Sequence, residues 1–413
     1  MSDFTAFSPP AVLTRSRTGP AILPARHYRI AELDPGLAAL ADARLSIYRS
    51  FAECEALWRD AMAGSAWFAF QSVDWLKTWQ HTIGDAEGVS PYIVRLADAA
   101  GRTLLILPLG VYREGWRRVL RFLGGVVTDY NAPLIAPDLA KRLTDAETAR
   151  LWAVVLKLLP PTDLVWLHRM PETIEGVHNP LAALPGACQR ETGQAATIPA
   201  TMDQFRKARS SKHFADTRRR RRRLAERGPV TFANPAPDSA EAQAIMPVLA
   251  RQKSRLWRET KCRDLFAEPA YIAFYERLMA EGMQGADVHV SSLSSGDTIV
   301  AAHWGLVSRG RFYFLVVTRE DGEWGFFSPG RLLMEDLVEW CVATPGVDRF
   351  DLTGGDEGYK SQWADEHLPL YELLAACSLK GAAYIAQHQL RQRLKRHRGL
   401  RNWIRRLRGK RPK

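Results

Sequence analysis

The alternation of apolar and polar positions is clearest between Phe326 and Trp363. From Pro329 onward, apolar residues recur every three to four positions with charged residues between them, which predicts an amphipathic helix. We expect Ser328 to cap this helix, Pro329 to occupy its first position, and Thr344-Pro345-Gly346 to end it. One face carries Leu333, Met334, Leu337, Val338 and Cys341, and the other carries Arg331, Glu335, Asp336 and Glu339.

A short strand and a polar group are expected after this helix. The strand covers 348–352, and Gly354-Gly355 predicts a turn at its end. The polar group behind the turn contains Asp356, Tyr359, Lys360 and Trp363.

The start of the helix has the features of an anion site. Gly330 has no side chain to block free backbone N–H groups. Arg331 stands in the first turn, where the helix dipole disfavours a cation, so a nearby anion would explain its position. A pair with Glu335, one turn later, is the simpler explanation when the helix is taken alone.

The first half of the chain shows a succession of helices and strands. Ser72 is the expected cap of a helix whose apolar side carries Trp75, Leu76 and Trp79. Further helices are expected at 42–62 and 145–159, strands at 92–96, 103–111, 118–123 and 164–168, and a polar loop at 128–131.

The second half repeats this order. Helices are expected at 201–227, 239–257 and 269–281, and strands at 288–293, 298–307 and 312–317, before the helix and strand described first. The repeat predicts a mixed α/β (α+β) fold of two similar domains in tandem, each a mixed sheet flanked by helices. The expected parts are a mobile leader (1–40), an N-terminal domain (41–200), a C-terminal domain that begins with a basic helix (201–380) and a basic tail (381–413).

Charge is distributed unevenly along the chain. It has 57 Lys and Arg against 45 Asp and Glu, a net charge of +12. Thirteen of the basic residues and no acidic ones follow Leu373, so the body is close to neutral, unlike a uniformly basic nucleic-acid binder. In the tail, Trp403 and several aliphatic residues stand among arginines from Leu390 onward. Residues 390–413 are therefore typical either of a helix that adheres to an anionic membrane surface or of a frayed terminus.

Arg218 to Arg223 form a second basic run, inside a helical stretch that ends at Gly228-Pro229. Six successive arginines wind around the whole helix, so some of them face protein or ligand. Three interpretations stay open: a solvated helix between domains, a wall that binds a phosphate-rich ligand, and a nucleic-acid surface.

Several common site types find no support in the sequence. The five cysteines are scattered, and no Cys/His spacing, Ser/His/Asp triad or P-loop stands out, so no metal is expected. There is no apolar signal segment and no run long enough to span a bilayer. We therefore expect a cytoplasmic protein, either free or held peripherally at the inner face of the membrane.

Five segments carry a family resemblance: QSVDWLKTW, TLLILPLGV, RFLGGVVTDYNAPLI, RRRRRRLAERGPVTF, and SPGRLLMEDLVEW with FDLTGGDEGYKSQWA. Together they cover about residues 65–365 and resemble the CelD/BcsL (cellulose biosynthesis) group, also called BioF2-like acetyltransferases. A wider resemblance is to Fem-type aminoacyl transferases. Both groups belong to the GNAT superfamily, and Fem-like members carry two GNAT-like domains in one chain.

The resemblance implies transfer of an acyl group to an amine or hydroxyl acceptor, with acetyl-CoA or another acyl-CoA as donor. The acceptor would be a small molecule, a polysaccharide or a peptide, in a pathway of cell-surface polysaccharide or cellulose biosynthesis. In GNAT domains the donor pyrophosphate lies between a strand and the next helix. Here that position gives Ser328, Gly330, Arg331 and Leu332 as the expected donor-binding residues.

Acyl transfer from a thioester needs a proton acceptor and stabilisation of the developing oxyanion. Asp356 is the expected base, with Asp351 as the alternative. Tyr359 is expected to protonate a leaving thiolate, and Lys360 to hold a phosphate or carboxylate. The expected acceptor-binding residues are Asp129, Tyr130, His303 and Trp363.

Each of these residues also has a purely structural interpretation. Asp356 could cap a turn, Tyr359 and Trp363 could simply pack, Lys360 could be a surface charge, and His303 could be a hydrogen-bonded core residue. Two other functions stay open for the chain. One is a Fem-like transferase that uses aminoacyl-tRNA, and the other is a degenerate acyltransferase fold that serves as a membrane-associated scaffold.

Overall fold

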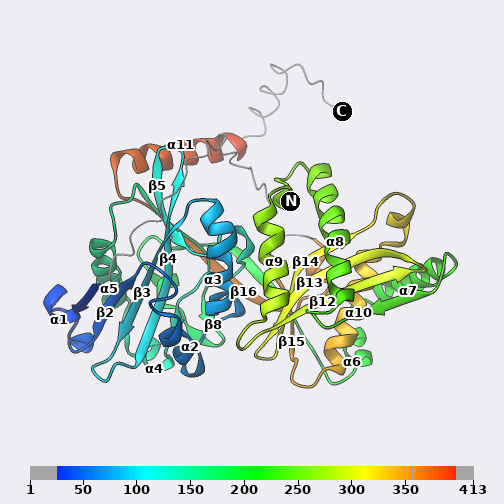
Figure 1. Ribbon diagram of the computed structural model, residues 1–413, viewed down its shortest axis with the longest axis horizontal. Coiled ribbons are helices and arrows are strands. Elements are labelled where there is room, and N and C mark those ends of the chain that lie inside the picture. The colour runs from blue at the N-terminus through cyan, green and yellow to red at the C-terminus, as the bar shows by residue number, and fades with distance from the viewer. Residues whose placement is uncertain (1–25, 356–357, 397–413) are drawn as a thin grey trace, which may run out of the picture.

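The computed structural model of the chain describes residues 26–355 and 358–396. Helices and strands alternate through both halves (Figure 1). Within these residues, no helix is both long enough and apolar enough to cross a membrane. The helices are α1 (Ile30–Leu33), α2 (Glu55–Gly64), α3 (Val73–Trp79), α4 (Pro137–Arg142), α5 (Asp145–Leu158), α6 (Met202–Lys207), α7 (Ser211–Ala225), α8 (Ala240–Glu259), α9 (Pro269–Glu281), α10 (Pro329–Ala343) and α11 (Leu379–Arg396).

The strands form one mixed sheet of fourteen, apart from a separate β8–β9 hairpin. The order in the sheet is β1-β2-β3-β4-β5-β7-β16-β10-β15-β14-β13-β12-β11, with β6 beside β4. The strands are β1 (Arg26–Arg29), β2 (Arg44–Tyr48), β3 (Ser90–Ala97), β4 (Thr103–Glu114), β5 (Arg117–Phe122), β6 (Leu134–Ile135), β7 (Leu164–Pro171), β8 (Thr173–Ile174), β9 (Val177–His178), β10 (Cys188–Thr197), β11 (Val230–Ala233), β12 (Asp287–Ser295), β13 (Thr298–Ser308), β14 (Arg311–Arg319), β15 (Arg349–Gly354) and β16 (Glu366–Ala376).

The repeated order predicted from the sequence is confirmed. In each half, antiparallel strands are followed by a helical crossover to a parallel strand: β5 to β7 through α5, and β14 to β15 through α10. A parallel pair requires such a crossover, usually a helix, because the chain must return to the end of the sheet at which the first strand began. The fold is therefore a mixed α/β architecture of two similar units in tandem.

The two units share strands at their junction. β10 follows the first unit in sequence but pairs with β15 of the second, and β16, the last strand, pairs with β7 of the first. β10 and β16 also pair with each other. The hydrogen bonds of one sheet therefore run from one unit into the other without a break. The expected domain boundary near residue 200 stays a prediction.

Helices cover both faces of the sheet and join the halves. In the second half, α8 and α9 lie on one face, and α10 lies on the other with α6 and α7 against it (Figure 1). Ser72 caps α3 as predicted, since its Oγ accepts the Trp75 N–H at 3.2 Å. The Trp75 ring then lies edge-on against Phe274 of α9, with ring centroids 4.8 Å apart. The halves thus meet through a buried aromatic core as well as through the sheet.

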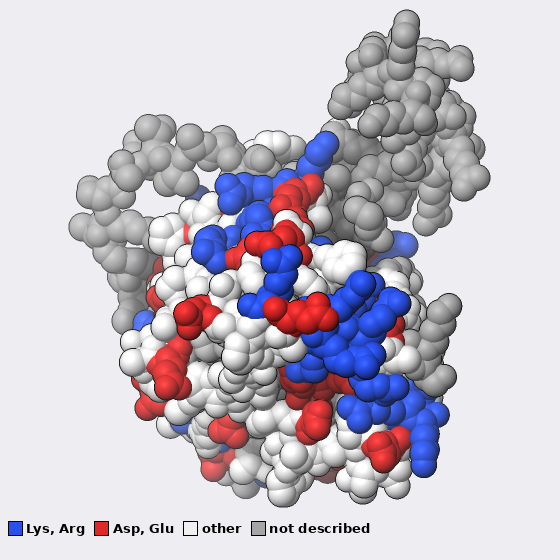
Figure 2. Space-filling view, turned by 90° about the vertical axis from the view of Figure 1, so that its right-hand side faces the viewer, with Lys and Arg blue, Asp and Glu red and all other residues white. Residues whose placement is uncertain are grey.

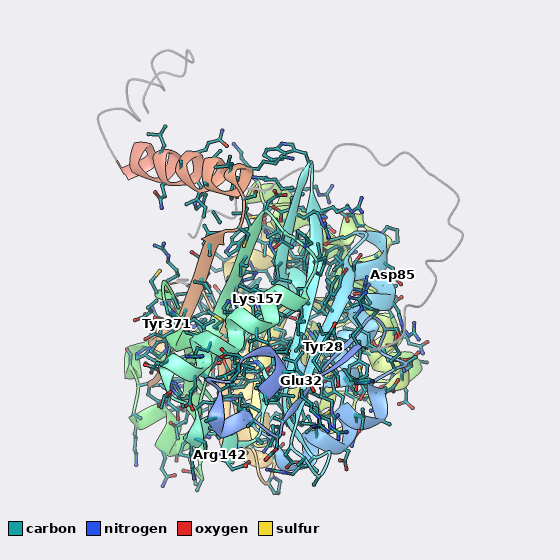
Figure 3. The ribbon with its side chains drawn as sticks, turned by 90° about the vertical axis from the view of Figure 1, so that its left-hand side faces the viewer. Tyr28, Glu32, Asp85, Arg142, Lys157 and Tyr371 are labelled. Atoms are coloured by element: carbon teal, nitrogen blue, oxygen red, sulfur yellow. The ribbon has the colours of Figure 1, made fainter. Side chains whose placement is uncertain are left out.

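The outer side of the first half carries three further segments (Figure 3). α5, which bears Lys157, lies beside the β1–α1 segment with Tyr28 and Glu32, while α11 crosses the end of the sheet. Arg150 of α5 donates to Asp34 at 3.0 Å, which ties α5 to the segment after α1.

Several boundaries differ from the sequence prediction. Residues 26–40 do not belong to a mobile leader, because β1 pairs with β2 and Ile30, Leu37 and Leu40 are buried. The helix expected at 42–62 is strand β2 followed by α2, and the one expected at 201–227 is broken between α6 and α7. Strands β6, β8, β9, β10, β11 and β16 were not predicted; β10 is mostly polar and β16 mixes polar residues with Leu and Ala, a weak strand signal that only pairing across the junction resolves.

Candidate active site

The corner between α7 and the start of α10 contains the expected donor-binding residues. Ser328 precedes α10, but its φ is +54° and its side chain makes no capping hydrogen bond, so the predicted cap is wrong. Its Oγ instead accepts from Arg220 Nη1 at 3.0 Å. Pro329 is the first helical residue, as predicted. Leu332 is fully buried, which leaves its side chain a packing role.

Arg331 does not pair with Glu335. Its Nη1 lies 3.1 Å from Asp216 Oδ2 of α7, and its Nη2 donates to the His213 carbonyl. Glu335 is itself buried and pairs with Arg206 of α6 at 3.1 Å. α6 and α7 thus cover part of the charged face of α10, while Glu339 on the same face is exposed. Gly330 lies next to β14, where an added Cβ would meet only ordinary van der Waals contacts.

The arginine run is divided between protein contacts and solvent. Arg220 binds Asp216 and the Phe326 carbonyl, and Arg221 binds Asp336 of α10. The opposite side of α7 is exposed, and Figure 2, which looks onto this end of the molecule, shows basic side chains gathered there. Exposed on it are Arg218, Arg219, Arg222, Arg223 and Arg227. Phe326, 62% exposed, lies under Arg223 at 5.4 Å.

The polar group after β15 is placed only in part. The expected base, Asp356, lies outside the described residues. Tyr359 is 41% exposed. Lys360 is not a surface charge: it is buried, and its Nζ donates to the Gly354 carbonyl at 2.6 Å. Trp363 is buried against Phe205, so the packing interpretation of that residue fits.

Two expected acceptor-binding residues lie elsewhere in the fold. His303 is fully buried in β13 and stacks on Phe314, with ring centroids 5.0 Å apart. Burial lowers its pKa well below the usual range, and within the described residues neither ring nitrogen has a hydrogen-bond partner. It is thus a core histidine, though not a hydrogen-bonded one. Asp129 forms an ion pair with Arg169 at 2.9 Å.

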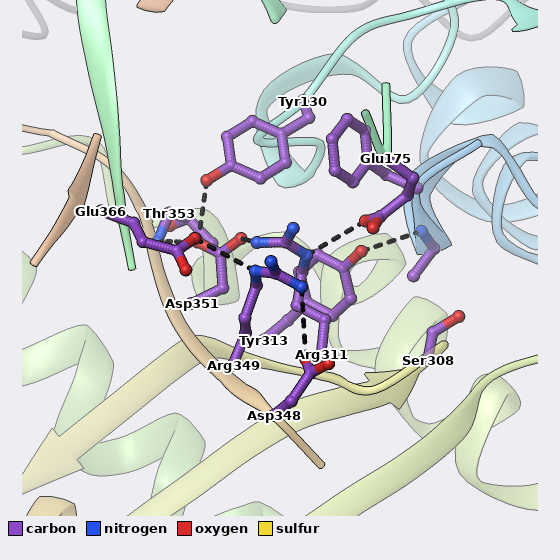
Figure 4. Close-up of polar contacts among 12 residues, drawn as sticks. Tyr130, Glu175, Ser308, Arg311, Tyr313, Asp348, Arg349, Asp351, Thr353 and Glu366 are labelled. Atoms are coloured by element: carbon purple, nitrogen blue, oxygen red, sulfur yellow. Dashed lines mark hydrogen bonds and ion pairs between the residues drawn. The ribbon is translucent and has the colours of Figure 1, made fainter. Parts of the chain in front are cut away.

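Tyr130 and Asp351 meet at the junction of the two halves (Figure 4). The Tyr130 hydroxyl donates to Asp351 Oδ1 at 2.8 Å, although the two residues are 221 positions apart. Asp351 is fully buried in β15 and also accepts from the Thr353 N–H at 2.7 Å and from Arg311 Nη1 at 2.8 Å. Gly193 lies against Tyr130, where an added Cβ would come 2.7 Å from the hydroxyl oxygen.

The backbone next to Asp351 is strained. Thr353 has a φ of +59°, a conformation that β-branched residues rarely adopt. The register with β10 also shifts here, because Gln194 faces Thr353 while Ala195 faces Asp351, which leaves Leu352 as the extra residue of a bulge. Bulges and strained residues of this kind gather at functional sites, where they redirect a side chain.

Arg311 is held from a second direction by Glu175. Its Nε donates to Glu175 Oε1 at 3.1 Å. Glu175 and Gly176 form the two-residue turn of the β8–β9 hairpin, and both have positive φ, as a type I′ turn requires. A glutamate in that position is unusual, since turns of this type favour Asn, Asp or Gly.

A cavity of about 370 Å³ opens beside this group. Its walls come from both halves and from the exchanged strands β10 and β16. At the wall, Arg349 of β15 pairs with Glu366 of β16 at 3.1 Å. The lining residues are Phe68, Tyr130, Thr173, Glu175, Gly176, Gly193, Gln194, Ala195, Arg311, Arg349, Glu366, His367 and Leu368.

β14 and β15 separate soon after they leave the cavity. Among the described residues they pair over 311–313 and 349–351, although β14 continues to Arg319. β14 also bulges at Leu315, since Trp304 faces Val316 and Gly305 faces Phe314. Strands that diverge leave backbone N–H and C=O groups facing the gap, where an extended ligand can hydrogen-bond.

Burial sets the protonation of the site. It raises the pKa of the Tyr130 phenol well above its usual range, and the neighbouring Asp351 adds to the rise. Burial also raises the pKa of the Asp351 carboxyl, while Arg311 and the hydrogen bonds to Tyr130 and Thr353 oppose the rise. Burial is the largest single effect and lowers the pKa of Arg311, but Asp351, Tyr313, Glu175 and Tyr130 together outweigh it, so the net shift is upward. The site thus holds a protonated phenol against a carboxylate that accepts protons more readily than an exposed one.

The sequence identified part of this site. Tyr130 was expected to bind the acceptor and Asp351 was the alternative base. Arg311, Glu175, Arg349 and Glu366 were missed because their segments show no motif. The one available signal was Glu-Gly between two short apolar pairs, ETIEGVH, which is a hairpin pattern.

The second half of the chain is similar to a known protein family. Residues 211–361 match the family model described as an acetyltransferase (GNAT) domain. The match indicates a GNAT acetyltransferase domain in the second half of the chain. No curated protein matches the chain.

Several solved structures align with most of this chain. FemX aligns with a TM-score of 0.52 at 10% identity, over 79% of this chain and 96% of its own. A conserved protein of unknown function from Bacteroides thetaiotaomicron aligns with a TM-score of 0.48 at 13% identity, over 78% and 96% of the two chains. A tandem GNAT protein of the clavulanic acid biosynthesis pathway aligns with a TM-score of 0.44 at 15% identity, over 81% and 99%. The likeness to FemX, in spite of low identity, shows a shared architecture.

Proposed function

We propose that this protein is an acyltransferase that moves an acyl group from acetyl-CoA or another acyl-CoA to an amine or hydroxyl acceptor in the junction cavity. The observation that carries the proposal is the contact of Tyr130 with Asp351 at the wall of that cavity. A phenol backed by a buried carboxylate can relay a proton, and acyl transfer to an amine must remove one.

The proposed chemistry follows from these groups. As an acceptor amine attacks the acyl carbon, its proton passes to the Tyr130 oxygen while the phenol proton passes to Asp351. The C–N bond forms, the C–S bond of the thioester breaks, and the thiolate leaves. Arg311 holds Asp351 in place.

The phosphates of the donor would lie at the corner of α7 and α10. The first amides of α10 offer little, because Pro329 has no N–H and the N–H groups of Arg331 and Leu332 already donate to the Ser328 carbonyl. The exposed guanidinium groups of Arg222 and Arg223 supply positive charge instead, and Phe326 offers an exposed ring for the base. This part of the site fits a nucleotide phosphate through side chains.

The same surface supports a second candidate, a Fem-like transferase that takes its acyl group from aminoacyl-tRNA. The exposed arginine face of α7 and the fold shared with FemX favour this candidate. RNA binding through phosphates falls steeply with salt, whereas a single CoA makes far fewer phosphate contacts.

Calorimetric titration of the full chain with acetyl-CoA, longer acyl-CoAs and bulk tRNA at two salt concentrations tests both candidates. We expect saturable acyl-CoA binding that weakens when Arg222 and Arg223 are replaced by Gln, and transfer that fails in Tyr130→Phe. Binding of tRNA alone, with a steep salt dependence, would establish the second candidate. If neither donor binds, the result would favour a catalytically degenerate scaffold.

We further propose that the chain belongs to the CelD/BcsL (BioF2-like) group and acts in cell-surface polysaccharide or cellulose biosynthesis. The five resembling segments support this placement. The test compares polysaccharide acylation between cells that carry the wild-type protein and cells that carry Tyr130→Phe. Unchanged surface polymers would refute the placement.

An anionic membrane surface is the proposed partner of the basic tail, at residues 390–413. Residues 397–413 lie outside the described ones, but the outer face of α11 supports the idea. Leu379 and Leu390 are 91% and 57% exposed, with Lys380 beside them. Vesicles with and without anionic lipid test this; removal of residues 390–413 should abolish sedimentation with anionic vesicles, and unchanged sedimentation would refute it.

A further inference from the structure

Two arginines line the junction cavity, and each is shared by two carboxylates. Arg311 lies 2.8 Å from Asp351 and 3.1 Å from Glu175. Arg349 lies 3.3 Å from Asp348 and 3.1 Å from Glu366.

This arrangement leaves an excess of negative charge. Each guanidinium neutralises one of its two carboxylates, so one negative charge remains for each arginine. Asp348, at 66% exposure, is screened by water, but Asp351 is fully buried and Glu175 is 18% exposed. The potential in the cavity therefore favours a cation.

Glu175 and Glu366 are the carboxylates that line the cavity directly. They approach it from opposite sides in Figure 4, with Tyr130 and Arg311 between them. Glu175 comes from the β8–β9 hairpin and Glu366 from the first residue of β16. A ligand in the cavity thus has an acidic group on each side of the phenol.

The outer pair can open to admit a charged ligand. Arg349 and Glu366 are each 38% exposed, and ion pairs at such exposure contribute less than about 1 kcal/mol. An ammonium group could therefore replace Arg349 as the partner of Glu366 at a small cost in free energy. Glu175 is fixed more firmly, because Arg311 holds it and its hairpin turn places it at the wall.

We propose that the acceptor is a cation with at least two amino groups, of which one reacts at Tyr130 and another, as an ammonium, binds the carboxylates of Glu175 and Glu366. A diamine, a polyamine or a sugar with two amino groups belongs to this class. Glu175 and Glu366 are then specificity-determining residues. The inference rests on the proposed acyl transfer and adds the chemistry of the acceptor.

Three acceptors of equal chain length test the proposal on the full-length protein: a linear diamine, the matching monoamine and the matching ω-amino acid. We expect the diamine to exceed the monoamine at least tenfold in kcat/KM, and the ω-amino acid to be poorest because its carboxylate meets acidic walls. Glu175→Gln and Glu366→Gln should each reduce the ratio of diamine to monoamine several-fold. Arg190→Gln is the matched control, since Arg190 pairs with Glu372 of the same strand β16, outside the cavity lining.

Calorimetry without donor measures the same preference as binding, so the result does not depend on finding the right acyl group. Equal use or equal binding of the monoamine would overturn the proposed class, and preference for the ω-amino acid would point to a zwitterion instead. A diamine preference that both Gln variants leave intact would overturn the assignment of Glu175 and Glu366. Diamine binding with no transfer from any acyl-CoA would refute the proposed function while leaving the acceptor class standing.

Discussion

The junction cavity and the α7–α10 corner handle charge in opposite ways. At the cavity, guanidinium groups are shared among an excess of carboxylates, and the key group, Asp351, is fully buried. At the corner, the single carboxylate of Asp216 forms ion pairs with Arg219, Arg220 and Arg331, and further arginines face solvent. The difference suits an acidic pocket for a cationic acceptor and a basic surface for a phosphate-bearing donor.

The comparison also predicts different energetics. A buried ion pair loses several kcal/mol when one partner is removed, because the other charge stays buried without compensation. Exposed pairs are screened and contribute little. Substitutions at the cavity should therefore affect folding and chemistry, and substitutions on the outer face of α7 should affect binding alone.

The largest expected effect is on stability at the cavity. Asp351→Ala leaves Arg311 buried beside an empty position and should destabilise the fold by about 3–5 kcal/mol. Chemical denaturation measures this. Asp216→Ala, at the corner, should cost well under half as much; equal losses at both sites would contradict the distinction between the two regions.

Tyr130→Phe removes one hydroxyl and keeps the ring that packs on Phe68, 5.0 Å away between centroids. We expect kcat to fall about 100-fold through loss of the proton relay, with KM for the donor little changed. Steady-state kinetics with a saturating donor shows this. A fall in kcat of less than about threefold would remove Tyr130 from the chemistry.

Asp336, at the α7–α10 corner, should make the stability of the protein depend on pH. Burial raises the pKa of this carboxyl to about 6, despite its ion pair with Arg221. The folded state therefore binds a proton that the unfolded state has already lost above pH 4, so stability should fall as pH rises from about 4 to 6. The slope from one group is at most about 1.4 kcal/mol per pH unit. Asp336→Asn should remove this part of the slope, which denaturation at several pH values measures; an unchanged slope would show that Asp336 titrates normally.

The smallest expected effect comes from the outer face of α7. Replacing Arg222 and Arg223 together with Gln should raise KM for the donor about fivefold, an effect that shrinks at high salt, and leave the unfolding free energy unchanged. Arg258→Gln, on the last turn of α8, is an exposed control at which no change is expected. A loss of stability in the double variant would show that these arginines hold the helix in place.

Strong local patterns explain which elements were predicted. Ser72 followed by Trp75, Leu76 and Trp79 specifies a capped apolar helix, and the mostly apolar run from Thr298 to Val307 specifies a strand, wherever each element lies. The same applies to the repeat of the whole succession in both halves. Ser328 was mistaken for a side-chain cap because its residue type and position suit one. Its hydroxyl oxygen instead accepts a hydrogen bond from Arg220, 108 positions away.

The spacing of apolar residues along short segments was enough to predict the repeated order of elements and helix α10. The tertiary structure decided the site. β10 and β16 cross the junction, and the contact of Tyr130 with Asp351 joins residues 221 positions apart. Glu175 reaches Arg311 only because a two-residue turn aims it there. Such contacts depend on strand order and on backbone conformation at single residues, which the periodicity of a sequence does not encode.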